Sequence, residues 1–187
     1  MKRLLTAACF AFATTSLATA QTAEEAVAYI LFGKEEAQIS GVTTKRISPK
    51  PAIFETKSSF FASRLTVSSE DQCRFKATEV SKVATDPRPS TVALEFDFSS
   101  ATPPVKTTTS TAIGALQVLV QVTGLKIISC SSPAAAPDRP TEMERQMEKM
   151  VCDMLKKGMP VTSQYSAERA TKALTLLRAS YCKAKAS

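Results

Sequence analysis

One stretch of the chain decides the fold class: Thr91-Val92-Ala93-Leu94-Glu95-Phe96-Asp97-Phe98. Its even positions are apolar and fall on one face, with Glu95 and Asp97 on the other, because successive side chains of a strand point to opposite faces. A strand with one apolar and one polar face is typical of an antiparallel sheet, whereas the buried strands of a parallel sheet are apolar throughout. We therefore expect an antiparallel sheet with one covered face.

The same period of two extends this sheet on both sides. Further strands are predicted at Thr43–Ser48, Ala52–Thr56, Phe60–Val67, Gln72–Val80 and Ala115–Val122. The intervening segments Asp86–Pro89 and Ser99–Ser110 are rich in Pro, Ser and Thr, which predicts loops. The sheet should contain four to six strands.

Helices are predicted before and after the strands along the chain. Thr22-Ala23-Glu24-Glu25 has the pattern of a capping box, and Gly33 is placed to end the helix that follows. A second helix should start after Thr141 and stop at Gly158.

Ser166 is expected to cap a last helix, whose inner face would carry Ala170, Leu174, Leu177 and Tyr181. The predicted fold class is therefore α+β, an antiparallel sheet covered by an N-terminal helix and a C-terminal helical pair.

Residues 1–20 have the parts of a cleavable secretory signal peptide. A short positive start at Lys2-Arg3 precedes an uncharged, mostly apolar run, which closes on Ala18-Thr19-Ala20, a pattern accepted by signal peptidase. The apolar run has about 14 residues, fewer than the roughly 20 that a membrane-spanning helix needs. We expect cleavage between Ala20 and Gln21, a periplasmic or secreted protein of a Gram-negative bacterium, and no membrane span after cleavage.

The composition divides the rest of the chain into three parts. We expect a helix plus antiparallel sheet at 21–130, a Pro/Ala-rich linker at 131–140 and a C-terminal helical pair at 141–187. The helical pair should pack on the sheet as one domain, because the apolar strand faces need a cover.

Four cysteines remain after the predicted cleavage: Cys73, Cys130, Cys152 and Cys182. An even number in an exported protein predicts disulfide bonds. Proximity in sequence favours the pairs Cys73–Cys130 and Cys152–Cys182. In a simple helical hairpin, however, the second pair would be offset by about 15 Å along the axis, beyond the reach of a disulfide. The pairing therefore stays open at this stage.

Charge and composition exclude several function classes. Cleavage would leave 22 basic against 17 acidic residues, a net charge of +5 without basic clusters, so we expect no nucleic-acid partner. The chain has no histidine, which excludes Ser-His-Asp and Cys-His catalysis and HExxH zinc sites. Its five glycines are isolated, which excludes a glycine-rich phosphate loop. No cofactor is expected, and an enzymatic role is disfavoured.

Paired carboxylates are the remaining catalytic candidates. Glu95 and Asp97 share a strand face, and Glu24-Glu25 and Glu35-Glu36 are adjacent in the sequence. Two carboxyl groups at a suitable distance can hydrolyse glycosides, so a hydrolase is one alternative function. Loss of turnover in a Glu95→Gln variant would identify it.

A methionine series gives a second alternative. Met143, Met147, Met150 and Met154 follow helical spacing, and thioether sulfur is a soft ligand suited to Cu(I). The same spacing describes any buried helix face, and methionine is a common core residue. Core packing is therefore the preferred interpretation of this series.

Two terminal stretches, TAEEAVAYILFG at 22–33 and LRASYC at 177–182, resemble small uncharacterised exported proteins of alphaproteobacteria. The resemblance implies a bacterial periplasm and no particular activity. The sequence thus predicts a non-enzymatic binding or envelope-interaction protein whose partner is an unknown small ligand or an envelope protein. Such a role requires an apolar groove between sheet and helices, or an exposed apolar patch.

Overall fold

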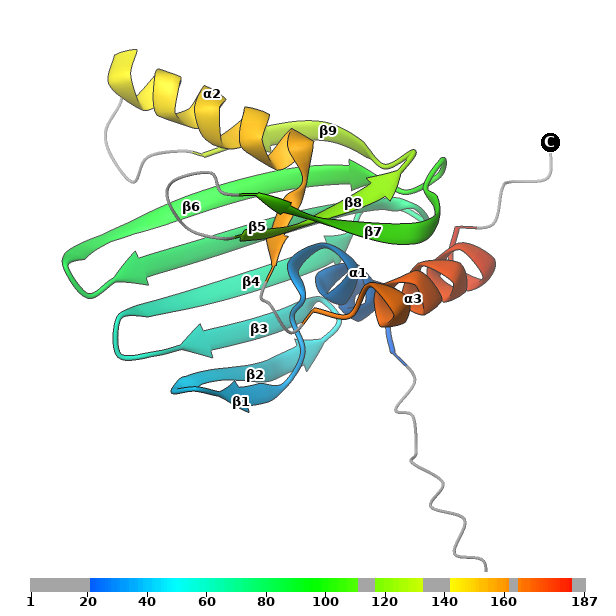
Figure 1. Ribbon diagram of the computed structural model, residues 1–187, viewed down its shortest axis with the longest axis horizontal. Helices are drawn as coiled ribbons and strands as arrows, with labels where there is room; N and C mark the ends of the chain where they lie inside the picture. The colour runs from blue at the N-terminus through cyan, green and yellow to red at the C-terminus, as the bar shows by residue number, and fades with distance from the viewer. Residues whose placement is uncertain (1–20, 111–116, 133–141, 162–164, 183–187) are drawn as a thin grey trace, which may run out of the picture.

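The computed structural model describes residues 21–110, 117–132, 142–161 and 165–182, so the predicted signal peptide at 1–20 lies outside it. The described residues form an α+β fold with a seven-stranded antiparallel sheet, a three-stranded antiparallel sheet and three helices (Figure 1). The strand orders are β1-β2-β3-β4-β5-β6-β9 and β10-β8-β7. The predicted class is confirmed, and the sheet is larger than the predicted four to six strands.

The helices are α1 (Ala23–Phe32), α2 (Glu142–Lys157) and α3 (Ala167–Ser180). The first five strands are β1 (Ala37–Ile39), β2 (Val42–Pro49), β3 (Ala52–Lys57), β4 (Phe61–Ser69) and β5 (Arg74–Val83). The other five are β6 (Asp86–Asp97), β7 (Thr102–Ser110), β8 (Gln117–Thr123), β9 (Lys126–Ser131) and β10 (Met159–Val161).

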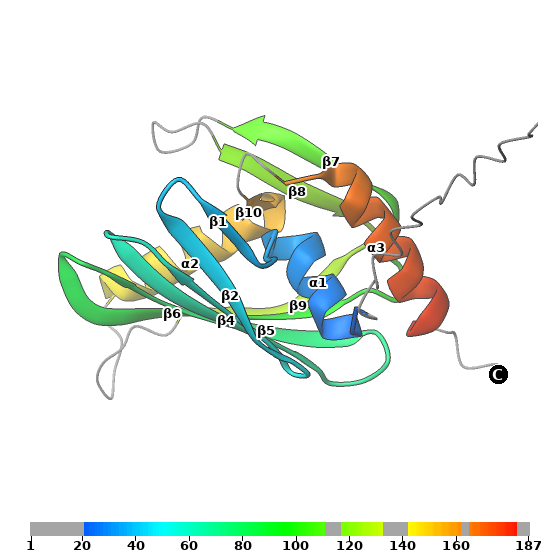
Figure 2. The ribbon, with the colours of Figure 1, turned by 90° about the horizontal axis from the view of Figure 1, so that it is seen from below.

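The centre of the core is α1. The Thr22 side chain accepts a hydrogen bond from the Glu25 amide, and the Glu25 carboxylate accepts one from the Thr22 amide, which confirms the predicted capping box. The helix ends at Gly33, whose φ is 60°. Every residue from Ala23 to Leu31 is buried, because the helix lies between the seven-stranded sheet and a layer formed by α3 and the smaller sheet (Figure 2).

The two faces of the large sheet are unequal. Phe54, Leu65, Phe75 and Phe96 are buried on the face that α1 covers, which we call the inner face. The opposite, outer face carries Glu95 together with many Lys, Arg and Thr side chains. This is the arrangement that the alternation at 91–98 predicts.

The C-terminal helices are not the predicted pair that covers the sheet. α3 packs on α1 and β7, whereas α2 lies against β9 and β10 (Figure 1). Between them, β10 pairs with β8 of the smaller sheet. Ser166 caps α3, and Ala170, Leu174 and Leu177 are buried as predicted, but Tyr181 is exposed because the helix ends before it.

Two segments expected to be loops are strands that contain proline. The predicted loop Asp86–Pro89 is the start of β6, and the predicted loop Ser99–Ser110 contains β7. Proline cannot donate to a ladder and is tolerated at sheet edges. The start of β6 is such an edge, because β9 pairs with β6 only from Ala93 onward. In the edge strand β7, Pro103-Pro104 lies where pairing with β8 is interrupted.

The predicted linker 131–140 and the predicted cap Thr141 lie almost entirely outside the described residues, apart from Ser131 and Ser132. Ser131 is the last residue of β9, so the strand continues into the expected linker.

All four cysteines predicted to form disulfides lie in pairs at disulfide distance. The pairs are Cys73–Cys182 and Cys130–Cys152, with Cα–Cα distances of 5.0 and 5.8 Å. The pairing that sequence proximity favoured is wrong, because α2 and α3 do not form a hairpin. The first bond ties the end of α3 to the start of β5, and the second fixes α2 to β9.

Candidate ligand-binding site

A cavity of about 490 Å³ lies on the inner face of the large sheet, beyond the C-terminal end of α1. Its size falls in the range of small-molecule sites. It is lined by Tyr29, Phe32, Gly33, Lys34, Glu35, Ala37, Ile39, Ser40, Val42, Thr44, Thr56, Phe61 and Tyr165.

The cavity arises because α1 is shorter than the strands it covers. Its 10 residues span about 15 Å, whereas the 9 residues of β4 span about 30 Å. The helix stops at Gly33, and the inner face continues to Phe61 at the far end of β4. The β1–β2 hairpin folds beside this uncovered part and closes the cavity on one side.

The polar residues of the lining are Glu35, Ser40 and a hydrogen-bonded cluster formed by Lys34, Thr44 and Thr56. Lys34 Nζ donates to Thr56 Oγ1 at 3.2 Å and forms an ion pair with Glu79 at 3.4 Å. The hydroxyl groups of Thr56 and Thr44 are 3.2 Å apart. Either hydroxyl can donate to the other, because a hydroxyl oxygen has two acceptor positions and Thr56 can accept from Lys34 and Thr44 together. The lysine and the two threonines thus form one hydrogen-bonded group in the cavity lining.

Aromatic side chains form the wall opposite the sheet. The rings of Tyr29 and Tyr165 are stacked at 5.7 Å between centroids, and Tyr165 Oη donates to the Ile30 carbonyl at 2.7 Å. Burial raises the pKa of Tyr165 well above its usual value, so its hydroxyl stays neutral. This wall is therefore a rigid, uncharged surface.

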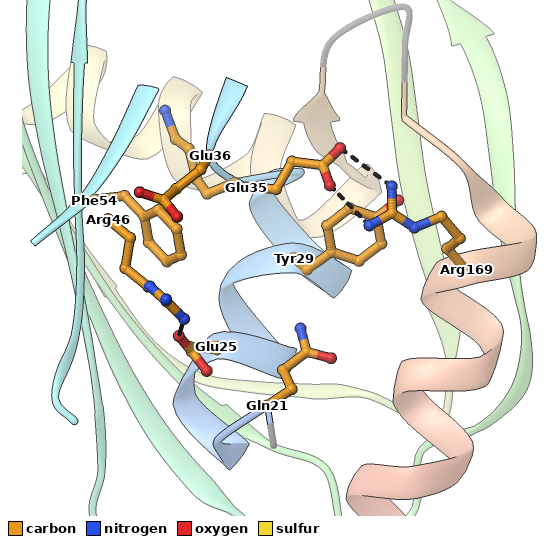
Figure 3. A pocket seen from close by; sticks show the side chains of 9 residues that line it. Gln21, Glu25, Tyr29, Glu35, Glu36, Arg46, Phe54 and Arg169 are labelled. Atoms are coloured by element: carbon orange, nitrogen blue, oxygen red, sulfur yellow. Dashed lines mark hydrogen bonds and ion pairs between the residues drawn. The ribbon is translucent and has the colours of Figure 1, made fainter. Parts of the chain in front are cut away.

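A second, polar cleft of about 270 Å³ lies on the other side of Tyr29 (Figure 3). Arg46 pairs with Glu25 at 2.6 Å. Arg169 forms a two-pronged pair with Glu35 at 3.3 and 2.8 Å and stacks 4.8 Å from the Tyr29 ring centre. Each guanidinium in this cleft therefore faces a carboxylate.

The hydroxyl of Tyr29 lies between the two cavities. Its oxygen is buried and makes no hydrogen bond with any residue that the structure describes, although the Ser166 backbone faces it. Burial raises the pKa of Tyr29, and the positive charge of Arg169 partly offsets this effect. A buried hydroxyl without a partner is uncommon, and a ligand acceptor or a water molecule would satisfy it.

No protein-family model, curated protein or solved structure matches the chain.

The predicted catalytic carboxylates do not form a catalytic pair in either cavity. Glu95 and Asp97 lie on the outer face of β6, away from both cavities. Asp97 Oδ1 accepts a hydrogen bond from the Ser99 amide at 2.7 Å, which lowers the pKa of Asp97. A general acid near neutral pH needs a raised pKa instead. Of the adjacent pairs, Glu24 is buried and Glu36 exposed, whereas Glu25 and Glu35 are held by arginines in the polar cleft.

Of the predicted methionine series, Met150 does not lie on the buried face of α2. Met150 is 63% exposed and Met154 half-buried, whereas Cys152 and Leu155 are buried. The core-packing interpretation is therefore wrong for Met150. The side chains of Met143 and Met147 lie outside the described residues, and copper binding by this series stays a prediction.

Apart from Glu35, none of the residues that line the cavity was a candidate site residue in the sequence. One signal was present: Thr56 follows Ala52 and Phe54 on the same strand face, so a polar side chain interrupts an apolar face. Lys34 gave no such signal, because a lysine after a helix-ending glycine resembles any exposed residue.

Proposed function

We propose that the protein is an exported, non-enzymatic binding protein that holds a small amphipathic molecule in the cavity beyond α1. The observation that carries this proposal is a mainly apolar cavity in which Lys34, Thr44 and Thr56 form a hydrogen-bonded polar cluster. Sites of this composition bury the apolar body of a ligand and orient it by a few polar contacts.

The polar cluster defines the head group of the ligand. A lysine ammonium has three N–H donors. Within the described part of the chain, Lys34 Nζ uses two of them, toward Thr56 and Glu79. The third donor and the Thr44 hydroxyl favour a head group with acceptor oxygens, such as a carboxylate or sulfonate. The aromatic wall and the side chains of Val42 and Ile39 suit an apolar body.

Filling the cavity should weaken ligand binding strongly. We expect Val42→Trp to weaken binding of the amphipathic fluorophore 1-anilinonaphthalene-8-sulfonate by about tenfold or more, because the indole occupies the volume that the probe needs. Fluorescence titration measures this effect. Thr43→Trp is the matched control, since residue 43 is the next in β2 and points to the outer face. Equal binding by both variants would contradict the proposed site.

The head-group contact can be tested separately. We expect Lys34→Met to weaken binding of the same anionic probe and to leave binding of neutral N-phenyl-1-naphthylamine nearly unchanged. A similar loss for both probes would mean that Lys34 acts only through packing.

Export is part of the proposal. Two cysteine pairs at disulfide distance are typical of oxidising compartments, and no helix within the described ranges is long and apolar enough to cross a membrane. Mass spectrometry of the protein from a periplasmic extract is expected to give a mature N-terminus at Gln21. A retained Met1 would contradict the predicted cleavage.

A further inference from the structure

Three hairpin turns meet at one end of the large sheet. The turns after β1, β3 and β5 all lie at the end away from α3 (Figure 1). The last two are joined directly, because the Ala84 amide donates to the Phe60 carbonyl at 2.9 Å. The turns after β3 and β5 therefore form one continuous tip, and the turn after β1 lies at the same end of the sheet.

This tip carries apolar side chains into solvent. Phe60 is 77% exposed and Val83 is 50% exposed, and Phe61 and Ile39 are partly exposed beside them. Phe61 and Val83 are register partners on β4 and β5, so their side chains are neighbours. A large phenyl ring at the end of a hairpin contributes nothing to the core of its own chain. A clustered apolar patch of this kind is typical of an interaction surface.

Positive charge lies immediately behind the apolar residues. Lys57 and Lys82 occupy the next row of the sheet, on either side of Ala62, and both are exposed on the outer face. Among the residues that the structure describes, Lys57 pairs with Glu55 alone, at 3.4 Å on the surface, and such a pair exchanges easily for another partner. Long lysine side chains can extend along a surface while an adjacent apolar group inserts.

We propose that this tip docks on an anionic lipid membrane. Exposed aromatic and aliphatic side chains with lysines one row behind them match an interfacial region, where apolar groups enter the acyl boundary and cations contact phosphate groups. Charge complementarity favours lipid over a second copy of the chain, because two identical tips would bring the same lysines together.

The docking surface adjoins the proposed ligand cavity. Ile39 and Phe61 line the cavity and also belong to the tip. This extends the proposed function, because docking would place the mouth of the cavity at the bilayer, where an amphipathic ligand could enter. The two proposals can fail separately: the cavity-filled Val42→Trp protein should still bind vesicles.

Vesicle sedimentation tests the docking surface. Full-length mature protein is expected to bind vesicles of equal parts phosphatidylglycerol and phosphatidylcholine, to bind pure phosphatidylcholine weakly, and to dissociate at high salt. Phe60→Ser with Val83→Ser should weaken binding about tenfold or more. Leu176→Ser is the matched control, because Leu176 is an exposed apolar residue on α3.

Two double variants that remove the same charge distinguish attraction at the tip from attraction by the net charge of the protein. Lys57→Gln with Lys82→Gln should weaken binding, whereas Lys76→Gln with Lys126→Gln, the same loss of charge near the other end of the sheet, should have little effect. Equal effects of the two pairs, or no binding of the parent protein to anionic vesicles, would overturn the proposal. The proposal would also be overturned if the parent protein did not bind vesicles and sedimentation equilibrium showed a dimer that Phe60→Ser with Val83→Ser disrupts.

Discussion

Replacing Cys73 and Cys182 together by serine is expected to lower the free energy of unfolding by about 5 kcal/mol. A cross-link stabilises a fold by restricting the unfolded chain, and the restriction grows with the length of the closed loop. This pair closes a loop across a sequence separation of 109 residues, from the start of β5 to the end of α3. Guanidinium unfolding followed by circular dichroism measures the change.

The second cysteine pair provides the matched comparison. Cys130 and Cys152 are separated by only 22 residues, so their replacement by serine should cost about 3 kcal/mol. Peptide mapping without reduction should recover the Cys73–Cys182 and Cys130–Cys152 cross-links. Recovery of Cys152–Cys182 instead, or a larger loss from the short-loop variant, would contradict this account.

The pairing also shows where sequence reasoning reaches its limit. The helices could be predicted because their ends carry local signals, such as the Thr22 capping box and Gly33. Partner choice among cysteines depends on how helices are placed in space. The insertion of β10 between α2 and α3 sets that placement. A strand of 3 residues leaves almost no pattern in the sequence, so the helical pair was expected where none forms.

The sheet could be predicted where strands are long and alternate. The stretch 91–98 gave the correct faces, and Phe96 is buried while Glu95 lies on the outer face. The proline-containing strands were missed because proline is tolerated only where one side of a strand has no partner, a property of the assembled sheet. The same limit applies to the cavity, which results from the difference in length between α1 and β4.

Gly124→Ala is expected to lower the free energy of unfolding by about 3 kcal/mol, although it adds one methyl group in an exposed turn between β8 and β9. Gly124 has φ of +77°, which costs an L-residue about 1–2 kcal/mol. In addition, a Cβ at this position would overlap the backbone carbonyl of Ser100, whose carbon atom would be 2.8 Å away. Backbone cannot rotate aside as a side chain can, so the turn must shift, at a further cost of about 1–3 kcal/mol.

Gly41→Ala separates the conformational cost from the steric cost. Gly41 has φ of +80°, but the space around an added Cβ is open. Its cost should be about 1 kcal/mol, the conformational part alone. The Ser99–Ala101 connection joins the two sheets. The difference between the two losses of unfolding free energy then gives the cost of the steric overlap between the β8–β9 turn and this connection. That connection also accepts a hydrogen bond from Arg178 of α3 at the Ala101 carbonyl, so the two sheets and α3 meet there. Equal losses for the two variants in chemical denaturation would mean that the turn and the connection are not in contact, and that the smaller sheet is held mainly by α3 and β10.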